Sequence, residues 1–177
     1  MIPTFSTSPK PQNNNAKIAT FICFAIAAAV CTVAIFLESY RGVIYMVAVC
    51  ALVAAIMLYT KYISPKYYYD VIGDTGEPLF VIRMRVGKRD DTLCRVALAD
   101  VMTVKRETKA ERRAHQKDRY TALYVYLPTL CPEVSYRVVV NDSHTRTELV
   151  LEGTEEFFDE LLRLSALARE ERGIPEE

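Results

Sequence analysis

The sequence IATFICFAIAAAVCTVAIFL fills positions Ile18 to Leu37 without a single charged residue. Five residues later a second uncharged run, VIYMVAVCALVAAIMLYT, fills positions Val43 to Thr60. At about 1.5 Å of rise per residue, either run is long enough as a helix to cross the roughly 30 Å hydrocarbon core of a bilayer. The two runs therefore predict a helical hairpin that enters a membrane, turns tightly and returns.

The charges beside these runs predict their orientation. Lys10 and Lys17 precede the first run, Lys61 and Lys66 follow the second, and the connector holds one Arg offset by one Glu. Because cationic flanks stay on the cytoplasmic side, both termini are expected there and the connector outside. We expect an integral protein of the plasma membrane.

A cleaved signal peptide is the alternative interpretation of the first run. The run is longer than the usual signal core of 7–15 apolar residues, and no convincing small-x-small cleavage site follows it. A second apolar run then follows almost at once, as a membrane hairpin requires.

No ionisable residue lies inside either run, so the hairpin is interpreted as an anchor rather than as a transport path. The pairs Ala25/Ala29 and Ala51/Ala55 have the small-xxx-small spacing that lets two membrane helices pack closely.

The rest of the chain divides by composition. Residues 1–16 are rich in Pro, Ser, Thr and Asn and are expected to form a disordered tail. The hairpin occupies residues 17–63, a single domain residues 64–173, and a short tail residues 174–177. From residue 64 onward, 18 Lys and Arg face 21 Asp and Glu, so the net charge is −3, which argues against a dedicated nucleic-acid binder.

Alternating apolar and polar residues predict seven antiparallel strands in this domain. The segment LFVIRMRV shows the pattern best, with Phe80, Ile82 and Met84 on one face and Arg83 and Arg85 on the other. The predicted strands are Tyr67–Ile72, Leu79–Val86, Thr92–Leu98, Val101–Arg106, Tyr120–Leu127, Ser135–Val140 and Thr145–Leu151.

A helix is predicted after the last strand. Thr154 is a suitable N-cap, and Phe157, Leu161 and Leu164 form one apolar stripe at helical spacing. Gly173 and a following Pro end the pattern. Such a helix is expected to cover an open end of the curved sheet.

This order of elements resembles the pleckstrin-homology-like fold, in which seven strands form two near-orthogonal sheets closed by a C-terminal helix. With the hairpin in front, the chain is similar to bacterial membrane-anchored proteins of that group, and Cys94–Val104 resembles their recurring apolar-x-Leu-x-Asp-Val stretch. Lipid-reading members carry Lys and Arg in the first hairpin, whereas Ile72–Pro78 is acidic here. Phosphoinositide binding is therefore not carried over.

The most basic segment is KRETKAERRAHQKDR, from Lys105 to Arg119, with net charge +4. We interpret it as a long exposed loop or polar helical excursion between two strands. It is a candidate contact for anionic lipid headgroups or an acidic protein partner, and a merely solvated loop is the alternative. The candidate residues are Lys105, Arg106, Lys109, Arg112, Arg113, Lys117 and Arg119.

No catalytic, cofactor-binding or metal-binding pattern is recognised. His115 and His144 are isolated, and the five cysteines lack the spacing of a zinc site or a disulfide framework. Nothing assembles a nucleophile, a base and an oxyanion site.

We therefore expect a non-catalytic binding or scaffolding module at the inner membrane surface, without a cofactor. An accessory subunit of a membrane complex, assembled through its two spans, is the alternative. An enzyme whose site is not visible as a motif is a third and weaker hypothesis.

Overall fold

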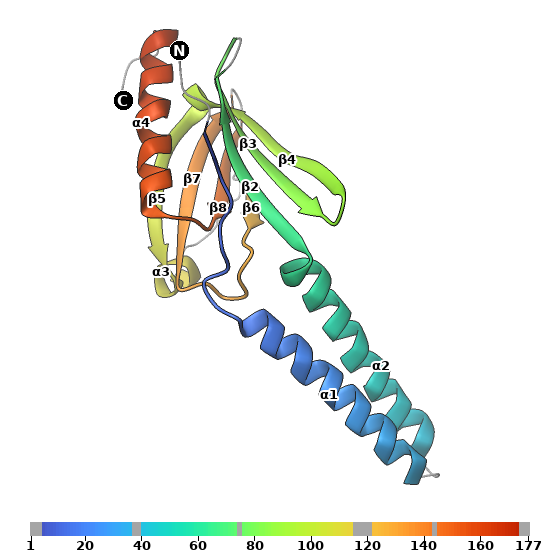
Figure 1. Cartoon of the computed structure of the whole chain (residues 1–177). Helices are drawn as coiled ribbons and strands as arrows, with labels where there is room; N and C mark the ends of the chain where they lie inside the picture. Colours follow the sequence, from blue (N-terminus) through green and yellow to red (C-terminus); the bar gives the residue numbers. More distant parts are fainter. Residues whose placement is uncertain (1–4, 37–39, 74–75, 115–121, 143–144, 174–177) are drawn as a thin grey trace.

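The computed structural model of the chain describes residues 5–36, 40–73, 76–114, 122–142 and 145–173. A two-helix hairpin projects from a domain made of two sheets and a C-terminal helix (Figure 1). The hairpin helices are α1 (Asn15–Phe36) and α2 (Arg41–Leu58), and a π-helical turn, η2 (Tyr59–Ile63), continues α2. Both helices are long and apolar enough to cross a membrane, as the sequence predicts.

Small side chains form the seam between α1 and α2. Thr20, Ala27 and Ala34 are buried at seven-residue intervals on α1, and Ala48 and Ala55 repeat that interval on α2. A seven-residue interval is close to two full turns of a helix, so these buried side chains lie on one face of each helix.

Of the small pairs predicted for this seam, only Ala55 is among its buried residues. Ala25 and Ala29 are exposed and Ala51 is half-buried. The four-residue spacing therefore did not predict which side chains lie in the seam, because the buried residues recur every seven residues.

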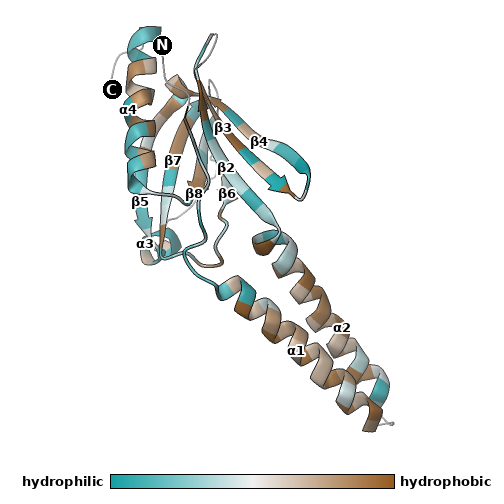
Figure 2. Ribbon diagram, in the orientation of Figure 1, coloured by the Kyte–Doolittle hydropathy of each residue, from teal (hydrophilic) through white to brown (hydrophobic). Residues whose placement is uncertain are grey.

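The outward faces of the hairpin are apolar and exposed (Figure 2). Only 17% of the most apolar window of α1 and 11% of that of α2 is buried. Large side chains such as Phe21 and Met46 are more than two-thirds exposed. A water-soluble domain rarely presents so continuous an apolar surface.

The first sheet is antiparallel, in the order β1-β2-β3-β4. Its strands are β1 (Phe5–Thr7), β2 (Pro65–Ile72), β3 (Leu79–Val86) and β4 (Arg89–Ala97).

Strand β1 precedes the hairpin and pairs with β2, which follows it, at Phe5↔Val71 and Thr7↔Tyr69. The prediction of a disordered tail over residues 1–16 is therefore wrong for Phe5–Thr7, which have a partner strand beyond the hairpin, and for Asn15 and Ala16, which begin α1. Residues 1–4 lie outside the described part of the chain.

The β3–β4 turn is tighter than predicted. Gly87 has φ +60°, which permits a two-residue turn with Lys88, so that Val86 pairs with Arg89. Strand β4 consequently begins three residues before the predicted Thr92.

The second sheet follows a 3₁₀ turn, η3 (Leu98–Asp100), and has the order β5-β7-β8-β6. Its strands are β5 (Val101–Thr108), β6 (Ala122–Tyr126), β7 (Val134–Asp142) and β8 (Thr145–Leu151).

The seven predicted strands correspond to β2–β8, so the described residues hold eight strands rather than seven. The all-antiparallel arrangement is also wrong, because β6 pairs with β8 in parallel. The basic segment separates β5 and β6 by enough chain for β6 to take the opposite edge of the sheet.

The two sheets enclose a core that helix α4 (Glu155–Arg172) closes on one side (Figure 1). Phe157 reaches the first sheet, with ring centroids 5.0 Å from Phe5 and 6.0 Å from Tyr69. Phe158 stacks on Tyr136 of the second sheet at 4.1 Å. The apolar stripe of α4 thus joins both sheets, as predicted for a covering helix.

The ends of α4 agree with the predicted signals in part. Gly173 has φ +69° and ends the helix in the left-handed conformation that glycine favours. Thr154 stands at the N-cap in an extended conformation, but its side chain makes no capping hydrogen bond.

Candidate functional site

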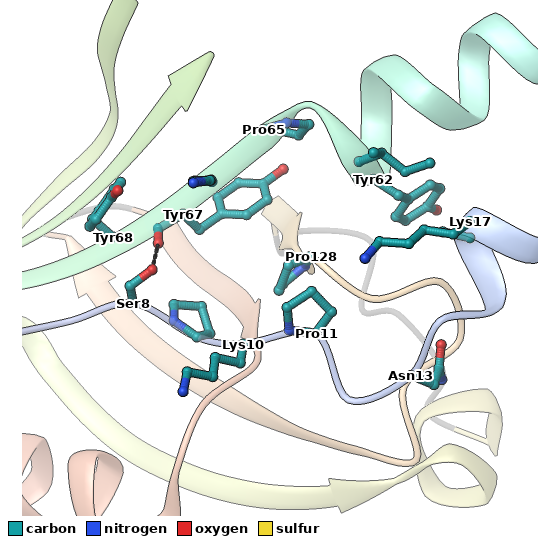
Figure 3. Close-up of a pocket in the computed structure, with 14 residues that line it drawn as sticks. Ser8, Lys10, Pro11, Asn13, Lys17, Tyr62, Pro65, Tyr67, Tyr68 and Pro128 are labelled. Carbon is teal, nitrogen blue, oxygen red and sulfur yellow. Dashed lines mark hydrogen bonds between the residues drawn. The ribbon is translucent and has the colours of Figure 1, made fainter. Parts of the chain in front are cut away.

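A cleft of about 380 Å³ lies where the hairpin joins the domain. Three segments far apart in the sequence form its walls (Figure 3): the chain before α1 with the first turn of α1, the end of η2 with the start of β2, and the β6–β7 loop. We call it the juxtamembrane cleft. Its lining residues are Ser8, Pro9, Lys10, Pro11, Asn13, Ala16, Lys17, Tyr62, Ile63, Pro65, Lys66, Tyr67, Tyr68 and Pro128.

Gln12 fixes the wall that precedes α1. Its side chain donates to the Val134 carbonyl (2.7 Å) and accepts from the backbone N–H of Glu133 (3.1 Å). Its own backbone N–H donates to Thr129 Oγ1 (2.9 Å) and to Glu152 Oε1 (3.1 Å). A segment with no regular structure is therefore held against the domain at both its backbone and its side chain.

Glu152 is the buried centre of this attachment, which we call the Gln12–Glu152 clasp. Its carboxylate accepts from Thr129 Oγ1 (2.5 Å) and from the Thr129 backbone N–H (3.1 Å). Burial raises the pKa of Glu152, and the hydrogen bonds from Thr129 and Gln12 oppose that shift without cancelling it. Tyr69 adds a further contact, since its hydroxyl lies 3.4 Å from the Glu152 backbone N–H.

The opposite wall comes from η2 and the first residues of β2. The π-helical turn ends with the Ser64 N–H donating to the Tyr59 carbonyl at 2.9 Å. Pro65 then starts β2, because proline cannot continue a helix. This change from helix to strand places Tyr62 and Tyr67 on the cleft wall.

The charge of the cleft is positive. Lys10, Lys17 and Lys66 line it, and no Asp or Glu is among the lining residues that the structure describes. Lys17 extends from α1 into the cleft, while Lys10 lies at its rim with its amine turned outward (Figure 3). Burial raises the pKa of Tyr67, with a smaller contribution from Tyr62, so the Tyr67 phenol is a neutral hydrogen-bonding group at physiological pH.

A smaller cavity of about 240 Å³ adjoins the cleft and shares Tyr62 and Tyr67 with it. Lys61 and Arg112 line this cavity and add two further cations. The Arg112 guanidinium donates to Ser135 Oγ (2.7 Å) and to the Pro132 carbonyl (2.9 Å). Arg112 therefore fastens its helix to β7 and carries positive charge at the cavity wall.

The structure describes five of the seven predicted contact residues and divides them between a strand and a short helix. Lys105 and Arg106 belong to strand β5, and Lys109, Arg112 and Arg113 to a six-residue helix, α3 (Lys109–Ala114). Lys117 and Arg119 lie outside the described residues, as do His115 and His144.

Strand β5 runs beyond its predicted end at Arg106, because Glu107 is buried in the sheet and paired with Arg137. Arg106 itself lies 3.7 Å from Glu155. Of the five predicted residues that the structure describes, only Arg112 lines a cavity next to the cleft.

Buried charge in the second sheet has a structural role. Arg137 donates to Glu107 at 2.6 and 2.8 Å and to Glu148 at 2.5 Å, and all three residues are at most 5% exposed. These hydrogen bonds raise the pKa of Arg137, with the contact to Glu107 as the largest cause. Within the part of the chain that the structure describes, no group of three or more His, Cys, Asp or Glu side chains could hold a metal ion.

Sequence reasoning missed Lys10, Lys17 and Lys66 as members of one site. Their signal was present in the sequence, since they flank the two apolar runs, but it was used only to orient the hairpin. The chain matches no protein-family model and no curated protein. The case for function therefore depends on the geometry of the chain itself.

Proposed function

We propose that this protein is a membrane-anchored, non-catalytic binding or scaffolding module, with its hairpin in the plasma membrane and its domain at the cytoplasmic surface. The observation that carries the proposal is the exposed apolar surface of α1 and α2, which has no covering element in the described chain. Burying that surface in hydrocarbon removes it from water, and helices satisfy their own backbone hydrogen bonds there.

The lysines at the base of the hairpin support the orientation. Lys17 precedes the first apolar residue of α1, and Lys61 and Lys66 follow the second apolar run. At the far end, Arg41 is the cation of α2, and its Nε donates to the Ala34 carbonyl at 3.4 Å. The excess of cations at the domain end favours a cytoplasmic domain.

We also propose that the domain belongs to the pleckstrin-homology-like group. Two sheets closed by a C-terminal helix support this assignment. Two features depart from the resemblance: β1 comes from the far side of the hairpin, and β6 is parallel to β8. We assign the domain a platform role because its base presents cations toward the membrane surface.

The experiment is fractionation and labelling of the full chain expressed in cells. The protein should stay in the membrane pellet after alkaline carbonate and enter solution only with detergent. Cys131 is exposed in the domain, and a variant can keep it as the single thiol. This variant should react with a membrane-impermeant maleimide only after the cells are opened. Extraction by carbonate would refute membrane insertion, and labelling of intact cells would refute the orientation.

A second candidate function has its own observation. An apolar groove of about 400 Å³ runs along the hairpin surface and is lined by Ala29, Val30, Val33, Val43, Ile44 and Val47. A helix of another subunit would fit such a groove, so the chain would then be an accessory subunit of a membrane complex.

Filling the groove tests this alternative. The double variant V33F/V47F should no longer be isolated with the complex, while the protein itself remains in the membrane. Unchanged co-isolation would exclude this groove as the interface.

A further inference from the structure

Three lysines from the two sides of the hairpin, Lys10 and Lys17 before its first apolar run and Lys66 after its second, line one cleft. Lys10 belongs to the segment held by the Gln12–Glu152 clasp, Lys17 to the first turn of α1, and Lys66 to β2. Each is exposed, so its side chain is free to turn toward a ligand in the cleft mouth, as Lys10, whose amine points outward in Figure 3, has to do. With no carboxylate among the described lining residues, the cleft favours an anion.

The cleft also has an apolar part. Most of its exposed wall is apolar, and prolines before α1, at the start of β2 and in the β6–β7 loop form much of it. Tyr62 and Tyr68 add rings that carry one polar atom each. A small, fully hydrated anion needs no such wall, whereas a ligand with a charged group and an aliphatic part does.

The position of the cleft indicates where that ligand comes from. Lys17 is followed immediately by Ile18, the first residue of the apolar run, and Tyr62 closely follows the end of the second run. Once the hairpin is in a bilayer, the cleft therefore lies at the layer of lipid phosphates, where Tyr side chains are also enriched. The exposed apolar faces of α1 and α2 continue from this layer into the hydrocarbon.

We propose that the juxtamembrane cleft binds the phosphate group of an anionic phospholipid from the surrounding leaflet, with Lys10, Lys17 and Lys66 around the phosphate. The glycerol part lies against the prolines and tyrosines, and the acyl chains follow the hairpin. This inference rests on the proposed function, because it requires a hairpin inserted in the bilayer.

The test uses the full chain in detergent and in nanodiscs, with phosphatidylglycerol as the anionic probe and phosphatidylcholine as the neutral one. Native mass spectrometry of the detergent complex counts bound lipid, and analysis of the nanodiscs measures its enrichment. The cleft variant is K10Q/K17Q/K66Q. Its matched control, R85Q/K88Q/R146Q, removes the same charge from exposed cationic side chains that neither line the cleft nor belong to the basic segment.

The expected effect follows from the charge removed. Each Lys near an anionic surface contributes about a fivefold gain in binding, so the cleft variant should lose about 100-fold in preference for phosphatidylglycerol. The control should lose only a few-fold, and K10R/K17R/K66R should retain the preference. The loss should shrink at high salt, because exposed charges are screened.

Two results would overturn the inference. Equal losses in the cleft variant and the control would mean that total charge, not the cleft, attracts the lipid. Displacement of the bound phosphatidylglycerol by millimolar inorganic phosphate would identify a site for soluble phosphate instead. Carbonate extraction of the same membranes distinguishes the failure of the two proposals. If the wild-type chain resists carbonate but shows no preference for phosphatidylglycerol, membrane anchoring stands and lipid binding in the cleft is refuted.

Discussion

Replacing Glu152 tests whether the Gln12–Glu152 clasp holds the chain before α1 against the domain. Glu152 is 1% exposed and accepts hydrogen bonds from Thr129 and Gln12. In E152A, the Thr129 hydroxyl and backbone N–H both lose a buried acceptor, at about 1–3 kcal/mol each. Gln12 keeps Thr129 Oγ1 as a partner for its N–H, so its loss is smaller.

The burial of the carboxylate offsets part of that cost. Burial raises the pKa of Glu152 above its ordinary value of 4.5, which means that the charged form is less stable here than in the unfolded chain. Removing the charge therefore recovers some free energy. We expect a net loss of about 2–3 kcal/mol in the free energy of unfolding for E152A, and a smaller loss for E152Q.

The same pKa predicts a pH dependence with a defined sign. Above 4.5 the folded chain binds a proton at Glu152 more readily than the unfolded chain does, so its stability rises as the pH falls through the raised pKa toward 4.5. E152Q has no proton to bind and should lack this contribution. The difference in unfolding free energy between wild type and E152Q should therefore shift in favour of wild type on acidification.

The measurement is denaturant unfolding of the full chain in a mild detergent, followed by the near-ultraviolet circular dichroism of its tyrosines. Hydrogen exchange at the β1 and β2 amides reports the local effect, and both strands should exchange faster in E152A. Unchanged unfolding and exchange in E152A would refute the clasp as an attachment of the chain before α1.

Three further substitutions test other contacts. A34L inserts a large side chain into the closed helix seam and should reduce disulfide crosslinking between cysteines engineered across it, whereas A28L, on an exposed face, should leave crosslinking unchanged. L161A should cost about 2–5 kcal/mol in denaturant unfolding because Leu161 is fully buried, and a similar cost for the partly exposed L162A would contradict the packing of α4. R137A removes the cation that two buried glutamates share and should lower the free energy of unfolding by about 3–5 kcal/mol. An unchanged midpoint of denaturant unfolding would contradict this.

Local pattern was sufficient for the elements that carry their own periodicity. The apolar run and the alternation that follows it in Leu79–Val86 predicted both ends of β3 correctly, and the stripe from Phe157 to Leu164 is the buried face of α4. Strand β1 could not be predicted in this way. It has three residues, and its stability comes from β2, which lies some sixty residues further along the chain.

The candidate site was likewise predictable only where local sequence is sufficient. The lysines beside the apolar runs are visible in the sequence, but their convergence depends on Gln12 reaching Val134 and Glu152. The assignment of Glu107 to an exposed loop or helical excursion was wrong, because no local pattern distinguishes this glutamate, buried beside Arg137, from a solvated acid. Long-range partners decide both cases.

The pairing of β1 with β2 also sets an order of events during biosynthesis. A ribosome must release residues through Val71 before Phe5 can find its place, and by then both apolar helices have already emerged. Completing the first sheet therefore waits until both hairpin helices have been synthesised. In the membrane-anchored state that we propose, the edge strand of the domain can pair only after the second apolar helix has followed the first.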